Sequence, residues 1–525
     1  MCKRFAGLFL VLLTGACSQR AVLLPANSPD AFRAGGPPAS AANVSITVKV
    51  PSGAGAAQSI SAQTGATKAV QNLSPGAPGC SGSNPLICTF TISANVGNEA
   101  FSFVTYSGPN GTGSQIAAGN VLQKVTAAGA SISLTLLGTT ASVTLALPSG
   151  VRQCDPAVTL PLYVMAKTSA GDTIIGAYGT RVSLTDSDTS GDTVLSASSV
   201  TSSAANVTLA YNGFVLQAAT ISPAVRGLPK HAMHSATLRP QQMMYVTDFY
   251  NGVNEFALTA NGDVPPVRRF PVALSTEDDF LTPDCHLYVT INGGNSVDII
   301  DLLHGSSSTL SGTNTGLLFP MAIGVDSSGK IYVSTQQDPA SGLPGIEVFA
   351  AGASGDATPI AYLGGLATKI QTPNALTFDA AGNLFIADTD SFSGQPAIEV
   401  FPAGSTGNVA PAQFLYGNTV SAFGIAVDAA GNMYVSEGRL FNVPGTIDTF
   451  PKGSTGNVTP SNQINVQYGH GPGGVALDYR GNLYVNIFNS NTVVSYPAGA
   501  TGDATPTTVL SGSKTNFSNA EDVSL

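Results

Sequence analysis

Oxygen-bearing side chains alternate in one short segment, residues 186–192, which reads DSDTSGD. Aspartates at alternate positions followed by a glycine form the donor pattern with which a short loop can hold calcium. The twelfth position of such a loop would be Ala197, where a bidentate glutamate is needed. The alternative is a polar turn whose Asp and Ser side chains cap backbone N–H groups, and the missing glutamate favours this interpretation.

Cysteine and histidine offer little further chemistry. The histidines are scattered at positions 231, 234, 286, 304 and 470, and neither zinc-type Cys/His spacing nor a nucleophile–base set is present. Cys80 and Cys88 flank a polar loop and are predicted to form a disulfide, the alternative being two free thiols. Cys154 and Cys285 lie in different expected domains, and their spacing does not decide whether they pair.

The N-terminus predicts export. Basic residues precede an apolar run, 5–13, that is too short to span about 30 Å of hydrocarbon and is typical of a secretory signal. The end of this run, LTGAC, resembles a bacterial lipobox. That resemblance implies that residues 1–17 are a lipoprotein signal peptide and that Cys17 carries a lipid anchoring the chain in the cell envelope. Ser18 after the cysteine implies the outer membrane in a Gram-negative organism. A plain signal peptide with a nearby cysteine is the alternative.

The composition also indicates an exported, β-rich chain. Only 10% of its 525 residues are charged, against about 25% in a typical globular protein, and 58 residues are glycine. The formal net charge of −10 gives no electrostatic surface for nucleic acid, so we expect no nucleic-acid partner. The length predicts several domains.

The first half of the chain predicts two β-sandwiches. Residues 18–43 are rich in Pro, Gly, Ala and Ser and are expected to form a flexible tether. Period-2 runs of β-branched residues, separated by short turns, predict one sandwich at 44–138 and another at 139–227. The segment AKTSAGDTIIGAY in the second resembles a hairpin of bacterial immunoglobulin-like domains. Residues 228–240 are expected to be a linker.

The second half, from residue 241, is a repeat array. The segments 321–334, 374–387, 423–436 and 473–486 share an apolar strand ending in Asp, a turn containing glycine and a second strand. A third strand, another glycine turn and a fourth strand follow, and the unit recurs every ~50 residues, which is typical of a β-propeller blade. The aromatic residue of the second strand counts six units, at Tyr245, Tyr288, Tyr332, Phe385, Tyr434 and Tyr484.

These units resemble NHL-type repeats and the gluconolactonase/regucalcin propellers. The resemblance implies an all-β chain in which the two immunoglobulin-like sandwiches precede a six-bladed propeller at 241–525. The segment 519–525 is a lone first strand, whereas the unit around Tyr245 lacks one, so we expect the C-terminal strand to close the ring. The repeated aspartates (Asp326, Asp379, Asp428 and Asp478) could form a carboxylate ring, but Asp-x-x-Gly is ordinary turn chemistry.

The starts of the first strands are expected to surround the mouth of a central channel. There the chain places Glu277, Asp278, Met321, Asn374, Phe423, Gly473, Glu521 and Asp522. Gluconolactonase-like enzymes hold one divalent cation with Glu, Asn and Asp, so the resemblance implies Glu521, Asp278 and Asn374 as ligands of calcium or a similar ion. Four of the six units offer no good oxygen donor, and solvated acidic rim residues are the alternative.

The loops between the second and third strands vary in length on a repeated scaffold, which is where binding specificity usually resides. Rim candidates in these loops are Tyr250, Phe392, Arg439, Phe441 and Phe488, and His470, just before the strand that starts at Gly473, is a further rim candidate. We therefore expect a lipid-anchored binding or scaffold protein that recognises a protein or small ligand and is not an enzyme. The alternatives are a metal-dependent lactonase- or lyase-like enzyme acting at the channel mouth, and a purely structural envelope protein.

Overall fold

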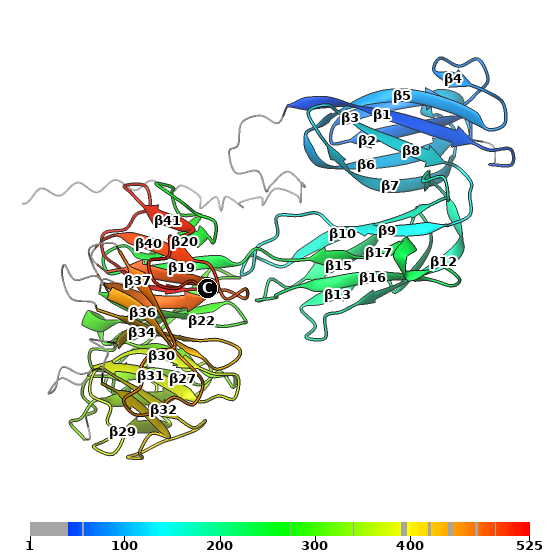
Figure 1. The fold of residues 1–525 in the computed structure, drawn as a ribbon. Helices are drawn as coiled ribbons and strands as arrows, with labels where there is room; N and C mark the ends of the chain where they lie inside the picture. The colour runs from blue at the N-terminus through cyan, green and yellow to red at the C-terminus, as the bar shows by residue number, and fades with distance from the viewer. Residues whose placement is uncertain are drawn as a thin grey trace, which may run out of the picture.

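The computed structural model describes residues 40–54, 57–272, 275–339, 341–389, 396–417, 422–438, 445–467, 471–488 and 490–525. This part of the chain is almost entirely β-structure, with three single-turn 3₁₀ segments at Pro109–Gly111, Lys230–Ala232 and Asn292–Gly294. No helix in these ranges is long and apolar enough to cross a membrane. The N-terminal strands and the C-terminal repeats form two bodies that lie side by side (Figure 1).

One large sheet runs through both expected sandwiches. In the described residues it has ten strands: β1 (Ala41–Val50), β4 (Cys80–Ser81), β5 (Leu86–Asn95), β8 (Ala130–Thr135), β9 (Ser142–Ala146), β10 (Val158–Lys167), β11 (Thr173–Ile174), β13 (Thr193–Leu195), β15 (Val207–Tyr211) and β17 (Met233–His234). The link is a parallel pairing of β11 with β8, in which Thr173 lies opposite Leu134. The two expected sandwiches therefore share a hydrogen-bonded sheet.

Two four-stranded sheets cover this large sheet. The first has the order β3 (Thr67–Asn72), β2 (Ser59–Thr64), β6 (Gly97–Tyr106), β7 (Gln115–Val125). The second has the order β14 (Ser199–Ser202), β12 (Ala177–Asp186), β16 (Ala219–Val225), β18 (Ala236–Leu238). Both β17 and β18 lie in the segment 228–240, so part of the expected linker belongs to the sheets.

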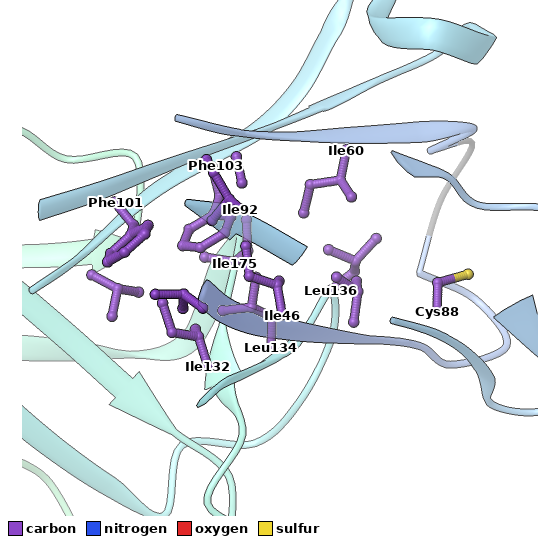
Figure 2. Packing of buried hydrophobic residues seen from close by; sticks show 14 of the residues in the cluster. Ile46, Ile60, Cys88, Ile92, Phe101, Phe103, Ile132, Leu134, Leu136 and Ile175 are labelled. Carbon is purple, nitrogen blue, oxygen red and sulfur yellow. The ribbon is translucent and has the colours of Figure 1, made fainter. Parts of the chain in front are cut away.

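Each covering sheet encloses its own apolar core. In the first core, alternate residues of β1 point inward, and Ile46 packs with Ile92, Phe101 and Phe103 (Figure 2). Ile175, from the second half, joins this core. The second core contains the fully buried Tyr178, whose hydroxyl donates to the Val164 carbonyl at 2.6 Å. The alternation of buried β-branched and exposed polar residues explains both layers.

The repeats form six four-stranded antiparallel sheets in the described residues; five are in sequential order, and the first adds the C-terminal strand β42 next to β19. Their strands are β19 (Met243–Asp248), β20 (Gly252–Ala257), β21 (Arg268–Phe270) with β42 (Ala520–Ser524); β22 (Thr276–Leu281), β23 (His286–Ile291), β24 (Ser296–Asp301), β25 (Ser306–Leu310); β26 (Ile323–Val325), β27 (Ile331–Thr335), β28 (Gly345–Phe349), β29 (Ala361–Gly364); β30 (Pro373–Phe378), β31 (Leu384–Thr389), β32 (Pro396–Phe401), β33 (Gln413–Tyr416); β34 (Ala422–Val427), β35 (Met433–Glu437), β36 (Gly445–Phe450), β37 (Asn462–Val466); and β38 (Pro472–Leu477), β39 (Leu483–Ile487), β40 (Thr492–Tyr496), β41 (Thr508–Ser511).

The first strands of successive sheets contact one another. β22 contacts β26, and the contacts continue through β30, β34 and β38 to β42, which contacts β22. β42 also pairs with β19, so the C-terminal strand completes the sheet of the first repeat, as the sequence predicts. Consecutive four-stranded sheets arranged in this way make a β-propeller-like fold.

The repeated aspartates cap turns. Asp326 Oδ1 accepts hydrogen bonds from the backbone N–H groups of Ser328 and Lys330 at 2.8 and 3.0 Å, and Gly329 has a φ of 81° that an L-residue rarely adopts. The same bonds recur at Asp379, Asp428 and Asp478. These carboxylates therefore stabilise hairpins and do not form a ring of ligands.

The oxygen-rich segment 186–192 is likewise a polar turn. Asp188 accepts hydrogen bonds from the backbone N–H groups of Ser190 and Thr193 at 2.9 and 2.8 Å. Partial burial acts to raise its pKa, but these bonds outweigh burial and lower the pKa of Asp188 to about 2. Asp188 thus caps the local backbone.

Candidate ligand-binding site

A cavity opens where the first strands of the six repeat sheets begin. Its lining, from all six sheets, is Glu277, Asp278, Met321, Asn374, Phe423, Gly473, Gly474, Glu521 and Asp522. These include every residue that the sequence places at the channel mouth. Because the repeats are aligned, equivalent strand positions converge on one point. The empty space at this opening, which includes open solvent, is about 300 Å³.

Two carboxyl groups of the cavity hydrogen-bond to each other. Asp278, on β22, shares a hydrogen bond with Asp522, on the C-terminal strand, and its Oδ2 accepts the Ile323 N–H at 2.8 Å. Burial, followed by the neighbouring charge of Asp522, raises the pKa of Asp278 well above its usual value. This hydrogen bond links the first strands of two sheets, β22 and β42.

Asp279 extends the cluster away from the cavity. Its carboxylate accepts hydrogen bonds from the hydroxyl groups of Thr247, at 2.6 Å, and of Ser524. Burial, and next the charge of Asp522, raises the pKa of Asp279 well above its usual value, although these hydroxyl groups act to lower it. Three acidic side chains therefore meet where β42 joins the ring.

The other two proposed metal ligands also line the cavity. The amide nitrogen of Asn374 donates to Thr389 Oγ1 at 3.0 Å and to the Ala422 carbonyl at 2.9 Å, so Asn374 bridges two sheets. Glu521 is 6% exposed and accepts a hydrogen bond from the Asn519 amide. The structure thus brings Glu521, Asp278 and Asn374 to one cavity.

These three residues do not make a ready metal site. Within the described ranges no group of three or more His, Cys, Asp or Glu side chains is placed to hold a metal ion. Asp278 hydrogen-bonds to Asp522, and its raised pKa disfavours the ionised carboxylate that a metal ion requires. Apart from Glu277 and Asp522, the other lining residues are Met321, Phe423 and two glycines, whose side chains offer no oxygen donor to a hard cation.

The rim candidates are placed in part. Tyr250 is 57% exposed in the loop between β19 and β20 and packs edge-on against Phe249, with ring centroids 4.9 Å apart. Phe488 is half-buried after β39. Phe392, Arg439, Phe441 and His470 lie outside the described residues, as does Cys17.

Three exposed apolar side chains on the same face were not foreseen. Phe319 is 46% exposed, Leu366 85% and Tyr416 50%. They lie where a fourth strand ends or leads into the next first strand, whereas the rim residues expected from the sequence, apart from His470, lie in loops between second and third strands. Alternation of strand direction puts both kinds of loop on the face of the cavity, and this topology could have identified them.

The cysteines form two disulfides. One joins Cys80 and Cys88, the pair predicted from the sequence. The other joins Cys154, in the second sandwich, to Cys285, in the turn between β22 and β23. That turn is on the face opposite the cavity, so the sandwiches attach behind the candidate site.

No protein-family model and no curated protein match this chain. Solved structures give distant likenesses. A Bacteroides caccae protein of unknown function is 11% identical over 54% of this chain and 98% of its own, with a TM-score of 0.38. The PQQ-bound aldose sugar dehydrogenase of Streptomyces coelicolor is 15% identical over 51% of this chain and 85% of its own, with a TM-score of 0.35. The RRP9 WD40 repeats are 10% identical over 46% of this chain and 64% of their own, with a TM-score of 0.34. Such scores carry no argument about function.

Proposed function

We propose that this protein is an exported, lipid-anchored binding protein that presents a six-bladed propeller for ligand recognition. In this proposal Cys17 carries the lipid, two immunoglobulin-like sandwiches form a stalk in the cell envelope, and the channel mouth receives the ligand. The closed circuit of contacts between first strands and the pairing of β42 with β19 support six blades. The two apolar cores support two sandwiches.

The observation that carries the binding role is the charge of the cavity. Glu277, Asp278, Glu521 and Asp522 line it, and none of its described lining residues is Lys, Arg or His. Asp278 hydrogen-bonds to Asp522, so the attraction of positive charge into this concave, partly desolvated site falls to Glu277 and Glu521. The ligand is therefore one that inserts a cationic group, such as the ammonium of a lysine side chain on a protein partner.

Titration calorimetry with lysine amide tests this binding. The Glu277→Gln/Glu521→Gln variant should bind the probe at least tenfold more weakly than the natural chain, because two of the carboxylates are lost. Glu99→Gln, in the first sandwich, is the matched control and should leave binding unchanged. Equal binding by the mouth variant, or no binding by the natural chain at millimolar probe, contradicts the proposal.

The second candidate is a metal-dependent lactonase- or lyase-like enzyme, favoured by the convergence of Glu521, Asp278 and Asn374 on one cavity. Metal analysis of the purified chain decides between the two. A stoichiometric divalent ion that is lost in Asn374→Ala, together with lactone turnover, would support the enzyme and contradict a pure binding role. A metal-free chain that leaves lactones intact would refute the enzyme.

Lipid attachment has a separate test. Radiolabelled palmitate should be incorporated into the natural chain and not into Cys17→Ser when both are expressed in a bacterium. A Cys2→Ser variant controls for the other N-terminal cysteine and should still be labelled. Unlabelled natural chain would leave a plain signal peptide as the correct interpretation.

A further inference from the structure

A repeated turn ties the outer edges of five of the six repeat sheets to the sheet before each of them. In the turn between the third and fourth strands, a glycine N–H donates to a carbonyl at the outer strand of the preceding sheet. We call each such bond a staple. The five staples, at 2.6–2.8 Å, join Gly262 to Val509, Gly355 to Thr309, Gly407 to Tyr362, Gly456 to Phe414 and Gly502 to Gln463.

Backbone conformation explains why these positions are glycine. Their φ angles lie between 59° and 79°, a region that L-residues rarely adopt. A Cβ added at any of them would meet nothing within 4 Å, so space is not the constraint. The staple therefore depends on the turn conformation itself.

An Asp or Asn follows each of these glycines and extends the tie. Asp356 accepts the Asn314 N–H and Asn408 accepts the Ala367 N–H, both at 2.7 Å. The acceptors are side chains of one sheet, whereas the donors lie in the loop that leaves the preceding sheet. Asp263 and Asp503 accept hydrogen bonds from the preceding sheet in the same way, so four of the five Gly-Asx pairs hold a neighbouring sheet at two points.

One junction lacks this device. We call it the seam: it lies between the sheet of β19–β21 with β42 and the sheet of β22–β25. The turn between β24 and β25, residues 302–305, reads LLHG and contains no Gly-Asx pair. No backbone hydrogen bond runs from this turn to the outer strand β21 in the described chain.

The second sandwich contacts the ring at the seam. Arg268, on β21, donates to the Cys154 carbonyl at 3.2 Å and to the Leu302 carbonyl of the short turn at 3.5 Å. The same guanidinium lies 3.6 Å from Asp155 and pairs with Glu255, whose side chain is fully buried. One side chain therefore joins β21, the neighbouring turn and the sandwich.

Covalent and backbone bonds reinforce this contact. The disulfide links Cys154 to Cys285, on the far side of the seam, and both cysteines are fully buried. Val215 donates its N–H to the Pro283 carbonyl at 2.9 Å. Cys154, Cys285 and Val215 share one apolar core with Met243 and Tyr245 of β19.

We propose that the second sandwich supplies the missing staple, as a strap across the seam formed by residues 152–155 and 213–215. The strap lies on the face opposite the channel mouth and holds the first and second sheets together. The ring is then complete only when the sandwich is docked, and the repeats are not an autonomous module.

Hydrogen exchange of the full chain tests the strap. In Cys154→Ala/Cys285→Ala we expect the amides of β21 and β22 to exchange at least tenfold faster than in the natural chain. The outer strands β29, β33 and β37, which are held by staples, should keep their rates. Unchanged exchange at β21 and β22, or equal acceleration in all six sheets, would overturn the proposal.

Two further variants complete the test. Cys80→Ala/Cys88→Ala removes the other disulfide, which is remote from the seam, and should leave exchange in all repeat sheets unchanged. Asp155→Asn keeps both disulfides and the side-chain shape, and therefore serves if the double-cysteine variant fails to fold. It should accelerate exchange about threefold at β21 only, and no change there would also count against the strap.

Discussion

At the scale of single residues, buried carboxyl groups that lie beside other acidic groups distinguish this chain. Glu347, on β28, is 3% exposed and has Asp338 as its acidic neighbour. Burial, and then the charge of Asp338, raises the pKa of Glu347 to about 8. A group of this kind favours the folded state when it is protonated, so these residues couple folding to pH.

Glu347→Gln should flatten the pH dependence of stability. A raised pKa means that the folded state binds a proton that the unfolded chain releases, so its contribution is present at low pH and is lost as pH rises through the folded pKa. Because of this group, the free energy of unfolding of the natural chain should fall by up to about 1.4 kcal/mol per pH unit between pH ~4.5 and 8. Above pH 8 this fall should level off.

Urea unfolding at intervals from pH 4.5 to 9.5 measures this effect. The difference in the free energy of unfolding between the natural chain and the variant should shrink as the pH falls and should change little above pH 8. Glu99→Gln, an exchange in the first sandwich, is the control. A pH-independent difference would show that Glu347 stays ionised when folded.

Gly407→Ala should weaken one staple. An alanine at a φ of 74° costs about 1–2 kcal/mol, although nothing within 4 Å obstructs its Cβ. The midpoint of denaturant unfolding should fall, and exchange of β29 should accelerate more than that of β37. Thr406→Ala changes the adjacent turn residue and should have no such effect; equal results for both variants would argue against a conformational role for the glycine.

At the scale of elements, the C-terminal strand is the most exposed to perturbation. β42 pairs only with β19 and places Ala520, Glu521 and Val523 in buried positions. Without it, β19 would present a row of unpaired backbone N–H and C=O groups at a sheet edge. Three acidic side chains, Asp278, Asp279 and Asp522, meet at this strand.

Deleting residues 520–525 should therefore destabilise the repeats and promote self-association. Light scattering and thermal unfolding of the truncated chain measure the two effects. Deleting Leu525 alone leaves every pairing of β42 with β19 intact and is the control. A truncated chain that stays monomeric with an unchanged melting temperature would mean that β42 is dispensable.

Elements of the repeats were predictable because their signals are local. An apolar strand, an Asp-x-x-Gly turn and a second strand lie within 14 residues, and alignment of the units places Glu277, Asn374 and Glu521 at equivalent positions, with Asp278 one residue further on. The strands missed in 228–240 carry no such signal. β17 and β18 are two and three residues long and are defined by their partners β9 and β16.

Long-range features could not be read from the sequence. The pairing of β11 with β8 involves only two residues, Thr173 and Ile174, and joins segments predicted as separate domains. The Cys154–Cys285 bond spans 131 residues and forms only because the sandwich reaches the seam. The Gly-Asx pairs were visible as a repeat, but their partners lie one unit earlier in the chain.

At the scale of the whole molecule, the two disulfides differ in what they connect. Cys80–Cys88 closes a loop with a sequence separation of 8 inside one sandwich. Cys154–Cys285 closes a separation of 131 and joins the sandwich to the repeats on the side away from the channel mouth. The mouth is thereby held facing away from the sandwiches, which suits a protein that presents this face to a ligand.

The two bonds should also differ in their contribution to stability. In the chain-entropy description, a cross-link restricts the unfolded chain more when the loop is longer: about 5 kcal/mol for a separation of 131 and about 2.5 kcal/mol for 8. Removing the long-range bond as Cys154→Ala/Cys285→Ala should lower the guanidinium midpoint more than Cys80→Ala/Cys88→Ala. The fluorescence of Tyr245 and its neighbours in the shared core should report this transition. If removal of the Cys80–Cys88 bond lowers the guanidinium midpoint more, native contacts of the short loop outweigh chain entropy. If the two variants have the same midpoint, the sandwich and the repeats unfold as one body even without the covalent link.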